Sequence, residues 1–448
     1  MSLLAYQQMK PSGIEYSDEI PSDWSLKRLG DLVAFAQGKA HEPYIDDDGD
    51  YICVNSRFVS TSGKTIKRCS VNLTPASLND ILMVMSDLPN GRALARAYYV
   101  DDHGKYAVNQ RVCRITAEKA HSRFLFYLLD RHPGLMQNDD GVHQTHLSNS
   151  DFQKLKLYLP SVSEQNQIAR FLDHETARID ALIEEQQRLI ELLKEKRQAV
   201  ISHAVTKGLD PTAPMKDSGV EWLGEVPAHW GFGKIRYFAK IESGHTPSRS
   251  KPEYWENCTI PWFSLADVWQ IRRGEVIELF ETKELVSEFG LANSSARLLP
   301  KGTVVLSRTA SVGYSAIMGC DMATTQDFAN WVCGSKLDNT YLLFCFRAMK
   351  SEFDRLMVGS THKTIYMPDI AGLVCSVPPR DEQGEIAAHI KISNSKFGDM
   401  IDEAERMKKL LSERRSALIS AAVTGKIDVR GWKPPASLPS PELVQEAM

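Results

Sequence analysis

Three short stretches have residue types that could bind a nucleotide or a metal ion. Gly63-Lys64-Thr65 matches the end of a phosphate-binding loop, but the position that needs the loop's first glycine is Phe58. The acidic run 46–50 lacks the closing glutamate of an EF-hand calcium loop. His143 and His146 have metal-ligand spacing without an evident third ligand. The sequence therefore predicts neither a catalytic residue nor a metal site.

Polar and basic loops are the other candidates for chemistry. Arg, Asn, Gln, Ser and Thr read base edges, and Lys, Arg, Ser, Thr and backbone N–H groups hold phosphates. The candidate DNA-contacting residues are Asn55, Ser56, Arg57, Lys64, Arg92, Asn109, Gln110, Arg111, Gln144, Thr145 and His146 in the first half, and Thr246, Arg249, Gln270, Arg272, Ser307, Arg308, Thr309, Thr325, Gln326, Thr361, His362 and Lys363 in the second. Each loop alone also suits a solvated surface, so the prediction depends on their recurrence at parallel places.

The sequence contains an internal repeat. Met9–Glu15 returns as Met215–Glu221, a shift of 206 positions that also carries Trp24 onto Trp230. Around Pro160 the shift becomes 218, because Pro160 returns as Pro378. Each copy has matching ends and a divergent middle. Either the middles drifted neutrally after an old duplication, or they are two similar devices that read different targets; the second interpretation is favoured because the divergence falls where a binding surface would lie.

A long helix is predicted at the end of each copy. Residues 164–205 lack proline and glycine, with Ser163 as the expected N-cap and Gly208 ending the helix. Gly384 and Gly398 are expected to fray or bend the second helix. A seam with coiled-coil spacing runs along each helix: Ile179, Ile183, Gln186, Ile190, Leu193, Arg197, Val200 and Ala204 in the first, and Phe397, Ile401, Ala404, Lys408, Leu411, Arg415, Leu418 and Ala422 in the second.

Neither seam can bury itself alone, so the two helices are expected to pack antiparallel to each other. About 40 residues at ~1.5 Å each make a rod of roughly 60 Å. Arg197 and Arg415 take equivalent seam positions, where they either extend to the surface or fix the register of the pair.

The predicted fold class is mixed α+β, with two α/β domains joined by two long antiparallel coiled-coil helices in a pseudo-two-fold repeat. Short apolar strands such as Tyr51–Val54 alternate with turns, and each half has one short apolar helix, 122–131 and 340–350. The expected boundaries are 1–160 for the first domain, 161–210 for the first helix, 211–378 for the second domain, 379–430 for the second helix and 431–448 for a disordered tail.

Composition limits the class of protein further. The chain has 448 residues, 43% of them hydrophobic, and eight cysteines without a C-x-x-C pair, which indicates a multidomain globular protein with reduced thiols. Neither a signal peptide nor an apolar run long enough for a membrane span is found, so a cytoplasmic location is expected. The net charge of −4 requires a DNA-binding chain to keep its positive charge local or to share the task with a partner.

Four stretches resemble the specificity subunit of type I restriction-modification systems, over essentially the whole chain to about residue 432. They are Asp217–Trp230, Gly244-His245-Thr246-Pro247 with Tyr254-Trp255 and Ile260-Pro261-Trp262, Val377-Pro378-Pro379 with Glu382-Gln383, and Ala422–Arg430. In the first copy the Gly-x-Thr-Pro element is reduced to Gln37-Gly38-Lys39-Ala40.

The resemblance implies a non-catalytic subunit for phage defence. Each target-recognition domain would read one half of a bipartite double-stranded DNA site, and the helices would set the spacer and dock two methyltransferase subunits. Those subunits would methylate adenine with S-adenosylmethionine, and two restriction subunits would translocate and cleave DNA with ATP and Mg²⁺. No cofactor is expected on this chain, which lacks the Asn/Asp-Pro-Pro-Tyr/Phe signature of adenine methyltransferases. The alternatives are a protein-interaction scaffold and the recognition half of a different DNA-modification system.

Overall fold

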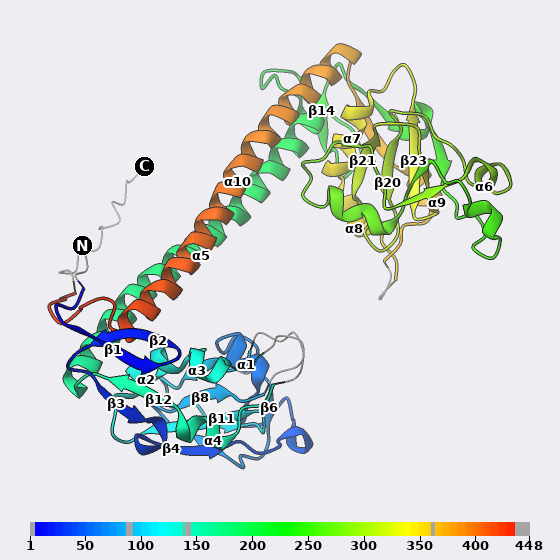
Figure 1. Cartoon of the computed structure of the whole chain (residues 1–448). Helices are drawn as coiled ribbons and strands as arrows, with labels where there is room; N and C mark the ends of the chain where they lie inside the picture. The colour runs from blue at the N-terminus through cyan, green and yellow to red at the C-terminus, as the bar shows by residue number, and fades with distance from the viewer. Residues whose placement is uncertain (1–4, 87–92, 138, 140–144, 360–362, 435–448) are drawn as a thin grey trace. The chain divides into compact units, whose positions relative to one another are not determined.

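The structure is a computed structural model that describes residues 5–86, 93–137, 139, 145–359 and 363–434. The chain divides into two compact units (Figure 1). Unit 1 comprises the described residues up to Glu184 and those from Lys408 onward, and unit 2 runs from Glu185 to Met407. The tail predicted to be disordered lies, beyond residue 434, outside the described residues. None of the described helices is long and apolar enough to cross a membrane.

Unit 1 contains two four-stranded sheets and two strand pairs, in the orders β6-β5-β10-β7, β4-β11-β8-β9, β1-β2 and β12-β3. The strands are β1 (Met9–Ile14), β2 (Ser17–Pro21), β3 (Ser25–Arg28), β4 (Val33–Gln37), β5 (Tyr51–Val54), β6 (Arg68–Cys69), β7 (Pro75–Ala76), β8 (Ile81–Val84), β9 (Ala97–Tyr99), β10 (Tyr106–Val108), β11 (Val112–Ala117) and β12 (Lys156–Leu159). Strand β10 runs parallel to β5 and antiparallel to β7.

Unit 2 repeats this plan with the orders β13-β14, β15-β24, β16-β23-β20-β21-β18 and β19-β17-β22. Its strands are β13 (Met215–Asp217), β14 (Glu225–Pro227), β15 (Gly231–Lys234), β16 (Ala239–Ser243), β17 (Ile260–Phe263), β18 (Glu278–Leu279), β19 (Glu284–Val286), β20 (Val304–Ser307), β21 (Ser315–Met318), β22 (Ala323–Thr324), β23 (Phe328–Cys333) and β24 (Val374–Val377). Here β17 and β22 form the parallel pair that corresponds to β5 and β10. The duplicated sequence therefore folds into duplicated sheets.

Short helices cover the sheets. They are α1 (Ser56–Ser60), α2 (Ser122–Leu129), α3 (Pro133–Met136) and α4 (Asn149–Lys154) in unit 1, and α6 (Glu288–Ala292), α7 (Asn339–Ala348), α8 (Lys350–Leu356) and α9 (Met367–Gly372) in unit 2. The 3₁₀ turns are η1 (Leu29–Asp31), η2 (Glu42–Tyr44), η3 (Ile235–Tyr237), η4 (Pro252–Trp255) and η5 (Leu265–Ile271). Both predicted apolar helices exist as α2 and α7, each ending earlier than expected and followed directly by a second short helix.

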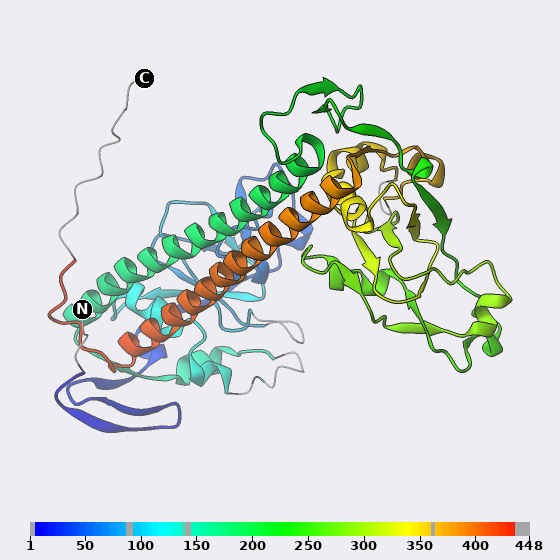
Figure 2. The same cartoon turned by 90° about the horizontal axis from the view of Figure 1, so that it is seen from above.

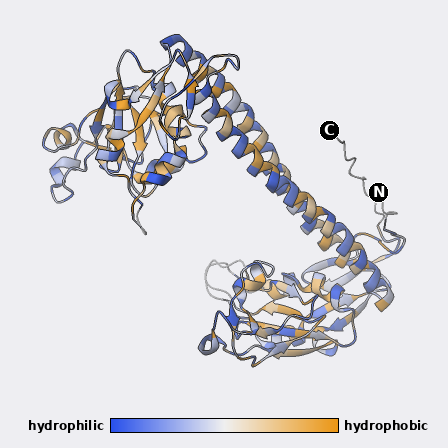
Figure 3. Cartoon of the chain, turned by 180° about the vertical axis from the view of Figure 1, so that it is seen from behind, coloured by the Kyte–Doolittle hydropathy of each residue, from blue (hydrophilic) through white to orange (hydrophobic). Residues whose placement is uncertain are grey.

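The core of each unit lies between its sheets and its long-helix segments. Phe124 and Leu172 belong to the largest apolar cluster of unit 1, and Tyr341 and Ile386 to that of unit 2. Figure 3 shows hydrophobic residues concentrated in the strands and alternating with hydrophilic ones along both long helices. The helices are thus anchored to the sheet domains by the same burial that stabilises the sheets.

The two long helices are α5 (Val162–Lys207) and α10 (Arg380–Val423). Figures 1 and 2 show them side by side. Unit 1 pairs the start of α5 with the end of α10, and unit 2 pairs the end of α5 with the start of α10, so the packing is antiparallel as predicted. Ile190, Leu193, Ile401 and Ala404 form an apolar cluster between them in unit 2. Every residue of both predicted seams is buried or half-buried.

Two helix-end predictions were wrong. Ser161, rather than Ser163, precedes α5, and its Oγ accepts a hydrogen bond from the Glu164 backbone N–H at 3.3 Å. Gly384 and Gly398 do not interrupt α10, which is one continuous helix. Tertiary packing accounts for the second difference, because a helix held along its seam tolerates the ~1 kcal/mol cost of an internal glycine.

The beginning of each long helix is fixed to its unit by the same contacts. The indole N–H of Trp24 donates to Glu164 at 3.3 Å, and that of Trp230 donates to Glu382 at 2.9 Å. The next residue, Gln165 or Gln383, donates to the carbonyl of Pro160 or Pro378 at 2.9 and 2.8 Å. These are the residues that the sequence repeat preserves, so the preserved positions are those that join helix to domain.

Candidate nucleic-acid interface

Backbone hydrogen bonds bring three polar loops of unit 1 to one edge of its sheets. The Asn109 N–H donates to Val54 O at 3.0 Å, which places loop 109–111 beside the start of α1. The Met85 N–H donates to Arg111 O at 2.8 Å, and the Leu147 N–H donates to Met85 O at 2.7 Å. We call the loops 55–57, 109–111 and 145–146 the reading edge of unit 1.

Unit 2 has an equivalent edge, built by matching bonds. The Thr325 N–H donates to Phe263 O at 3.0 Å. The Arg308 N–H donates to Asp327 O and the Ile365 N–H to Arg308 O, both at 2.9 Å. The reading edge of unit 2 is therefore formed by the loops 246–249, 307–309, 325–326 and 363–365. The structure brings together at this edge residues separated by more than 100 positions.

A glycine is required at the same place in both edges. A Cβ on Gly38 would lie far inside van der Waals contact with the Asn109 carbonyl, and one on Gly244 would do the same with Thr325. The strand that ends at each glycine passes directly over the neighbouring loop. Gly38 therefore has the same structural role as Gly244, although the Thr-Pro that follows in the second copy is missing from the first.

The candidates of unit 1 fall into exposed and internal groups. The exposed ones are Arg57, Lys64, Gln110, Arg111 and His146. Ser56 and Thr145 are half-buried, and Arg92 and Gln144 lie outside the described residues. Asn55 is the N-cap of α1, where its Oδ1 accepts from the Phe58 N–H at 2.9 Å. Asn109 is buried, donating to Glu42 at 3.2 Å and to the Cys53 sulfur at 3.7 Å.

Cys53 lies beneath this edge as an unreactive thiol. Burial raises its pKa to about 11, so the sulfur stays protonated at neutral pH. All eight cysteines are free. Among the described residues no three His, Cys, Asp or Glu side chains gather as a metal site would require, and His143 lies outside them.

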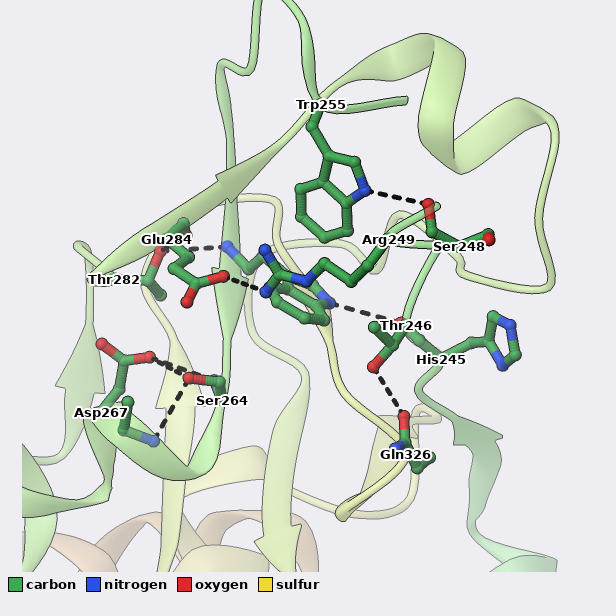
Figure 4. Close-up of polar contacts among 12 residues, drawn as sticks. His245, Thr246, Ser248, Arg249, Trp255, Ser264, Asp267, Thr282, Glu284 and Gln326 are labelled. Carbon is green, nitrogen blue, oxygen red and sulfur yellow. Dashed lines mark hydrogen bonds and ion pairs between the residues drawn. The ribbon is translucent and has the colours of Figure 1, made fainter. Parts of the chain in front are cut away.

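Arg249 is the most firmly held candidate of unit 2. Its guanidinium lies over the Trp255 ring, 4.0 Å from the centroid, and 5.3 Å from the centroid of Trp262. It also pairs with Glu284 (Figure 4). A cation stacked on an indole and held by a carboxylate has a fixed direction, which is the arrangement that presents a planar donor group to a ligand.

The neighbouring polar side chains are tied to one another. Thr246 donates to Gln326 Oε1 at 2.8 Å (Figure 4). Arg308 donates from Nε to the Gln326 carbonyl at 3.0 Å. Ser307 and Thr325 are buried; the Thr325 hydroxyl donates to Asp327 at 3.0 Å. The edge is therefore a bonded network rather than a set of free loops.

The remaining candidates of unit 2 lie beside this network. Gln270 donates to Glu281 O at 3.3 Å, Arg272 and Lys363 are exposed, and Thr309 is half-buried. Thr361 and His362 lie outside the described residues. Trp269, in the same loop as Gln270 and followed by two arginines, is 68% exposed.

The chain contains two copies of one domain. Each copy has a polar loop edge and is joined to the paired long helices. These features define a protein with two equivalent candidate binding units. The chain matches the model of the type I restriction modification DNA specificity domain twice, at residues 21–193 and 227–396. Both matches together span most of the chain, so it belongs to this family. It is a specificity subunit with two target-recognition domains, and specificity subunits are non-catalytic parts of type I restriction-modification systems.

Individual proteins similar to this chain are also specificity subunits of type I systems. The type I restriction enzyme MjaVIII specificity subunit of Methanocaldococcus jannaschii is 22% identical over 429 residues, covering 92% of this chain and 94% of its own. The EcoBI specificity subunit of Escherichia coli is 36% identical over 105 residues, 22% of each chain. A chain from a structural study of complex assembly in a type I system has a TM-score of 0.68 at 15% identity, covering 91% of this chain and 99% of that one. The HsdS subunit of Thermoanaerobacter tengcongensis has a TM-score of 0.51 at 16% identity, over 91% and 98%.

Proposed function

We propose that each reading edge contacts one half of a bipartite site on double-stranded DNA. The observation that carries this proposal is the equivalence of the two edges. The same backbone bonds build both, while the side chains that they present differ. Gln110 and Gln326 occupy matching places, both exposed, but Arg111 follows the first and Asp327 the second. Two edges with equivalent backbone structure and different side chains suit two domains that recognise different base sequences.

Charge at the edges supports contact with phosphates despite the net charge of −4. The exposed basic residues among the candidates are Arg57, Lys64 and Arg111 in unit 1 and Arg249, Arg272 and Lys363 in unit 2. Two of these cations lie on each reading edge, Arg57 and Arg111 on the first and Arg249 and Lys363 on the second, which suits a modest phosphate contribution from each domain. We assign the remaining contacts with the DNA phosphates to partner subunits.

The outer faces of the long helices support docking of two like partners. Leu182, Leu189 and Leu192 are exposed on α5, and Met400, Met407 and Leu410 are exposed at the corresponding places on α10. In each helix the three side chains are spaced by seven and three positions, so they lie along one face. Twin apolar stripes related by the repeat provide two equivalent surfaces. We infer that each docks one methyltransferase subunit.

The proposed complex works on DNA in the cytoplasm. It would methylate adenine at N6 and cleave unmodified DNA, with two methyltransferase and two restriction subunits. S-adenosylmethionine, ATP and Mg²⁺ are assigned to those subunits. In this proposal the paired helices hold the two domains at a set separation and thereby fix the unspecified gap between the half-sites.

The test uses matched glutamines. In complex with the methyltransferase partner, Gln110→Ala should lower discrimination about tenfold or more at one base pair of one half-site, and Gln326→Ala should do the same in the other half. Selection of bound sequences from a random duplex pool measures both. If either variant altered both halves equally, or the complex bound no DNA at all, the protein-interaction scaffold would be the better account.

A further inference from the structure

A cavity of about 300 Å³ lies in unit 2, where the end of α5 packs on the sheet domain. Its walls are formed by α5, the segment that follows η5, the turn before β21, and helices α7 and α8. The charged side chains that line it are Arg197, Arg272, Arg273, Arg347, Lys350 and Asp354. Five cations thus face one carboxylate around a partly enclosed space.

Most of this positive charge is not neutralised by the protein. Arg273 pairs with Asp402 and, at 3.5 Å, with Glu275. For Arg197, Arg272 and Lys350 we find neither an ion pair nor a hydrogen bond to any other described residue. Arg197 is half-buried and Arg272 and Lys350 are exposed, and all three line the same cavity.

Arg347 forms the inner wall. Its Nη1 donates to Gly274 O and its Nη2 to Val276 O, both at 2.7 Å, which fixes the guanidinium in place. Burial, together with the nearby charge of Arg197, lowers the pKa of Arg347 to about 10. The charge of Arg197 disfavours the charged form of Arg347, and an anion between the two guanidinium groups would offset this repulsion.

Comparison with unit 1 shows that the seam arginine of unit 2 lacks the carboxylate partner found in unit 1. In unit 1, Arg415 occupies the seam position of Arg197 and pairs with Asp180 on the facing helix at 2.8 Å. The repeat places Gly398 where Asp180 would stand. Unit 2 has therefore kept the seam cation and lost its carboxylate.

We propose that this cavity binds a phosphate group, with Arg197, Arg272 and Lys350 as its donors. Guanidinium and ammonium groups are the side chains that hold phosphate oxygens. The apolar wall from Ile201 and Phe353 excludes water on one side and strengthens those contacts. The proposal stands whether or not the reading edges bind DNA, because free phosphate is a sufficient ligand for the test.

The experiment titrates the full-length chain with inorganic phosphate at constant ionic strength in a calorimeter. Arg197→Gln should weaken phosphate binding at least tenfold, and Arg415→Gln, the matched change in unit 1, should leave it unaltered. Gly398→Asp should also weaken binding at least tenfold, because it returns the lost carboxylate without removing a cation. A Cβ at Gly398 meets only the Glu275 side chain, at 3.8 Å or more, so this variant has room to fold.

A second arm identifies the source of the phosphate. If phosphate competes with duplex DNA for the wild-type chain but not for Arg197→Gln, the natural ligand is a DNA phosphodiester. If phosphate binds without affecting DNA affinity, the ligand is a small free phosphate compound. Absence of saturable phosphate binding to the wild type together with unchanged DNA affinity in Arg197→Gln overturns the proposal, as does an equal effect of Arg197→Gln and Arg415→Gln.

Discussion

The two units use the same contacts to hold their helices and different contacts at the helix seam. Trp24 with Glu164 and Trp230 with Glu382 form the same indole-to-carboxylate hydrogen bond in the two units. At the seam, Arg415 pairs with Asp180, whereas the repeat has Gly398 at the position equivalent to Asp180, and Arg197 lies near a second arginine, Arg347. The contacts that join each domain to its helix are thus the same in both units, whereas the contacts at the seam differ. Each prediction below compares one unit with the other.

The largest effect is expected from removing the buried indoles. Trp24→Ala and Trp230→Ala each delete a side chain that is 1% exposed and remove one hydrogen bond to a glutamate, which keeps Tyr6 as a partner in unit 1 and His229 in unit 2. Each should lower the free energy of unfolding of its own unit by about 3–5 kcal/mol. Urea unfolding monitored by hydrogen exchange assigns the loss to a unit. Loss in only one of the two variants would mean that the units are not held alike.

A pH effect should separate the units. His132 in unit 1 is the N-cap of α3, and Met349 precedes the corresponding helix α8 in unit 2. Burial lowers the pKa of His132 from 6.5 to about 4. The unfolded chain therefore takes up this proton first, so the stability from the neutral ring is complete above pH 6.5 and is lost as the pH falls from 6.5 to 4. The loss should be about 3 kcal/mol.

The measurement is the stability of unit 1 at several pH values in wild type and in His132→Met. The variant carries the residue type found in unit 2 and should be less stable at pH 7. Its free energy of unfolding should change less than that of the wild type between pH 6.5 and 4. Identical slopes in both chains would show that His132 does not carry this dependence.

Partner docking should be lost one copy at a time. Leu189→Glu places a charge in the stripe of α5, and Met407→Glu does so at the matching position of α10. Each should weaken one of two methyltransferase sites by about 2 kcal/mol, roughly thirtyfold. Native mass spectrometry counts the bound copies, with one expected for either variant and none for the double variant at limiting concentration. Retention of two copies by the double variant would exclude the stripes as docking surfaces.

The smallest effect is expected at the seam of unit 1. Asp180→Asn removes the carboxylate that pairs with Arg415, but both side chains are partly exposed, at 51% and 35%. Such pairs contribute about 0.5 kcal/mol. Chemical denaturation should show a change of that size, declining with added salt. A much larger loss would mean that the pair fixes the register of the helices.

The sequence was sufficient to predict the scaffold. Every seam position from Ile179 to Ala422 is buried or half-buried, because helical periodicity reports directly which face is covered. The bounds of the helices were less predictable. Local propensity suggested a break at Gly398, and tertiary packing overrode it.

The reading edges were predictable in composition and not in orientation. Asn109, Ser307 and Thr325 have the residue types of base readers, yet their side chains point into the protein. Whether a polar side chain turns outward depends on hydrogen bonds to segments far along the sequence, such as that of Asn109 to Glu42. No local pattern contains that information. The clustering of cations around Arg197 was equally hidden, because its members come from three stretches that lie far apart in the sequence.

The most direct test exchanges residues 226–378 for the same segment of a relative with a different DNA target and determines the sequences that the resulting complex methylates. If each domain recognises its half-site independently, one half-site should have a new sequence, and the other half-site and the gap should be unchanged. A change in both half-sites, or in neither, would contradict the central claim that each domain reads its own half.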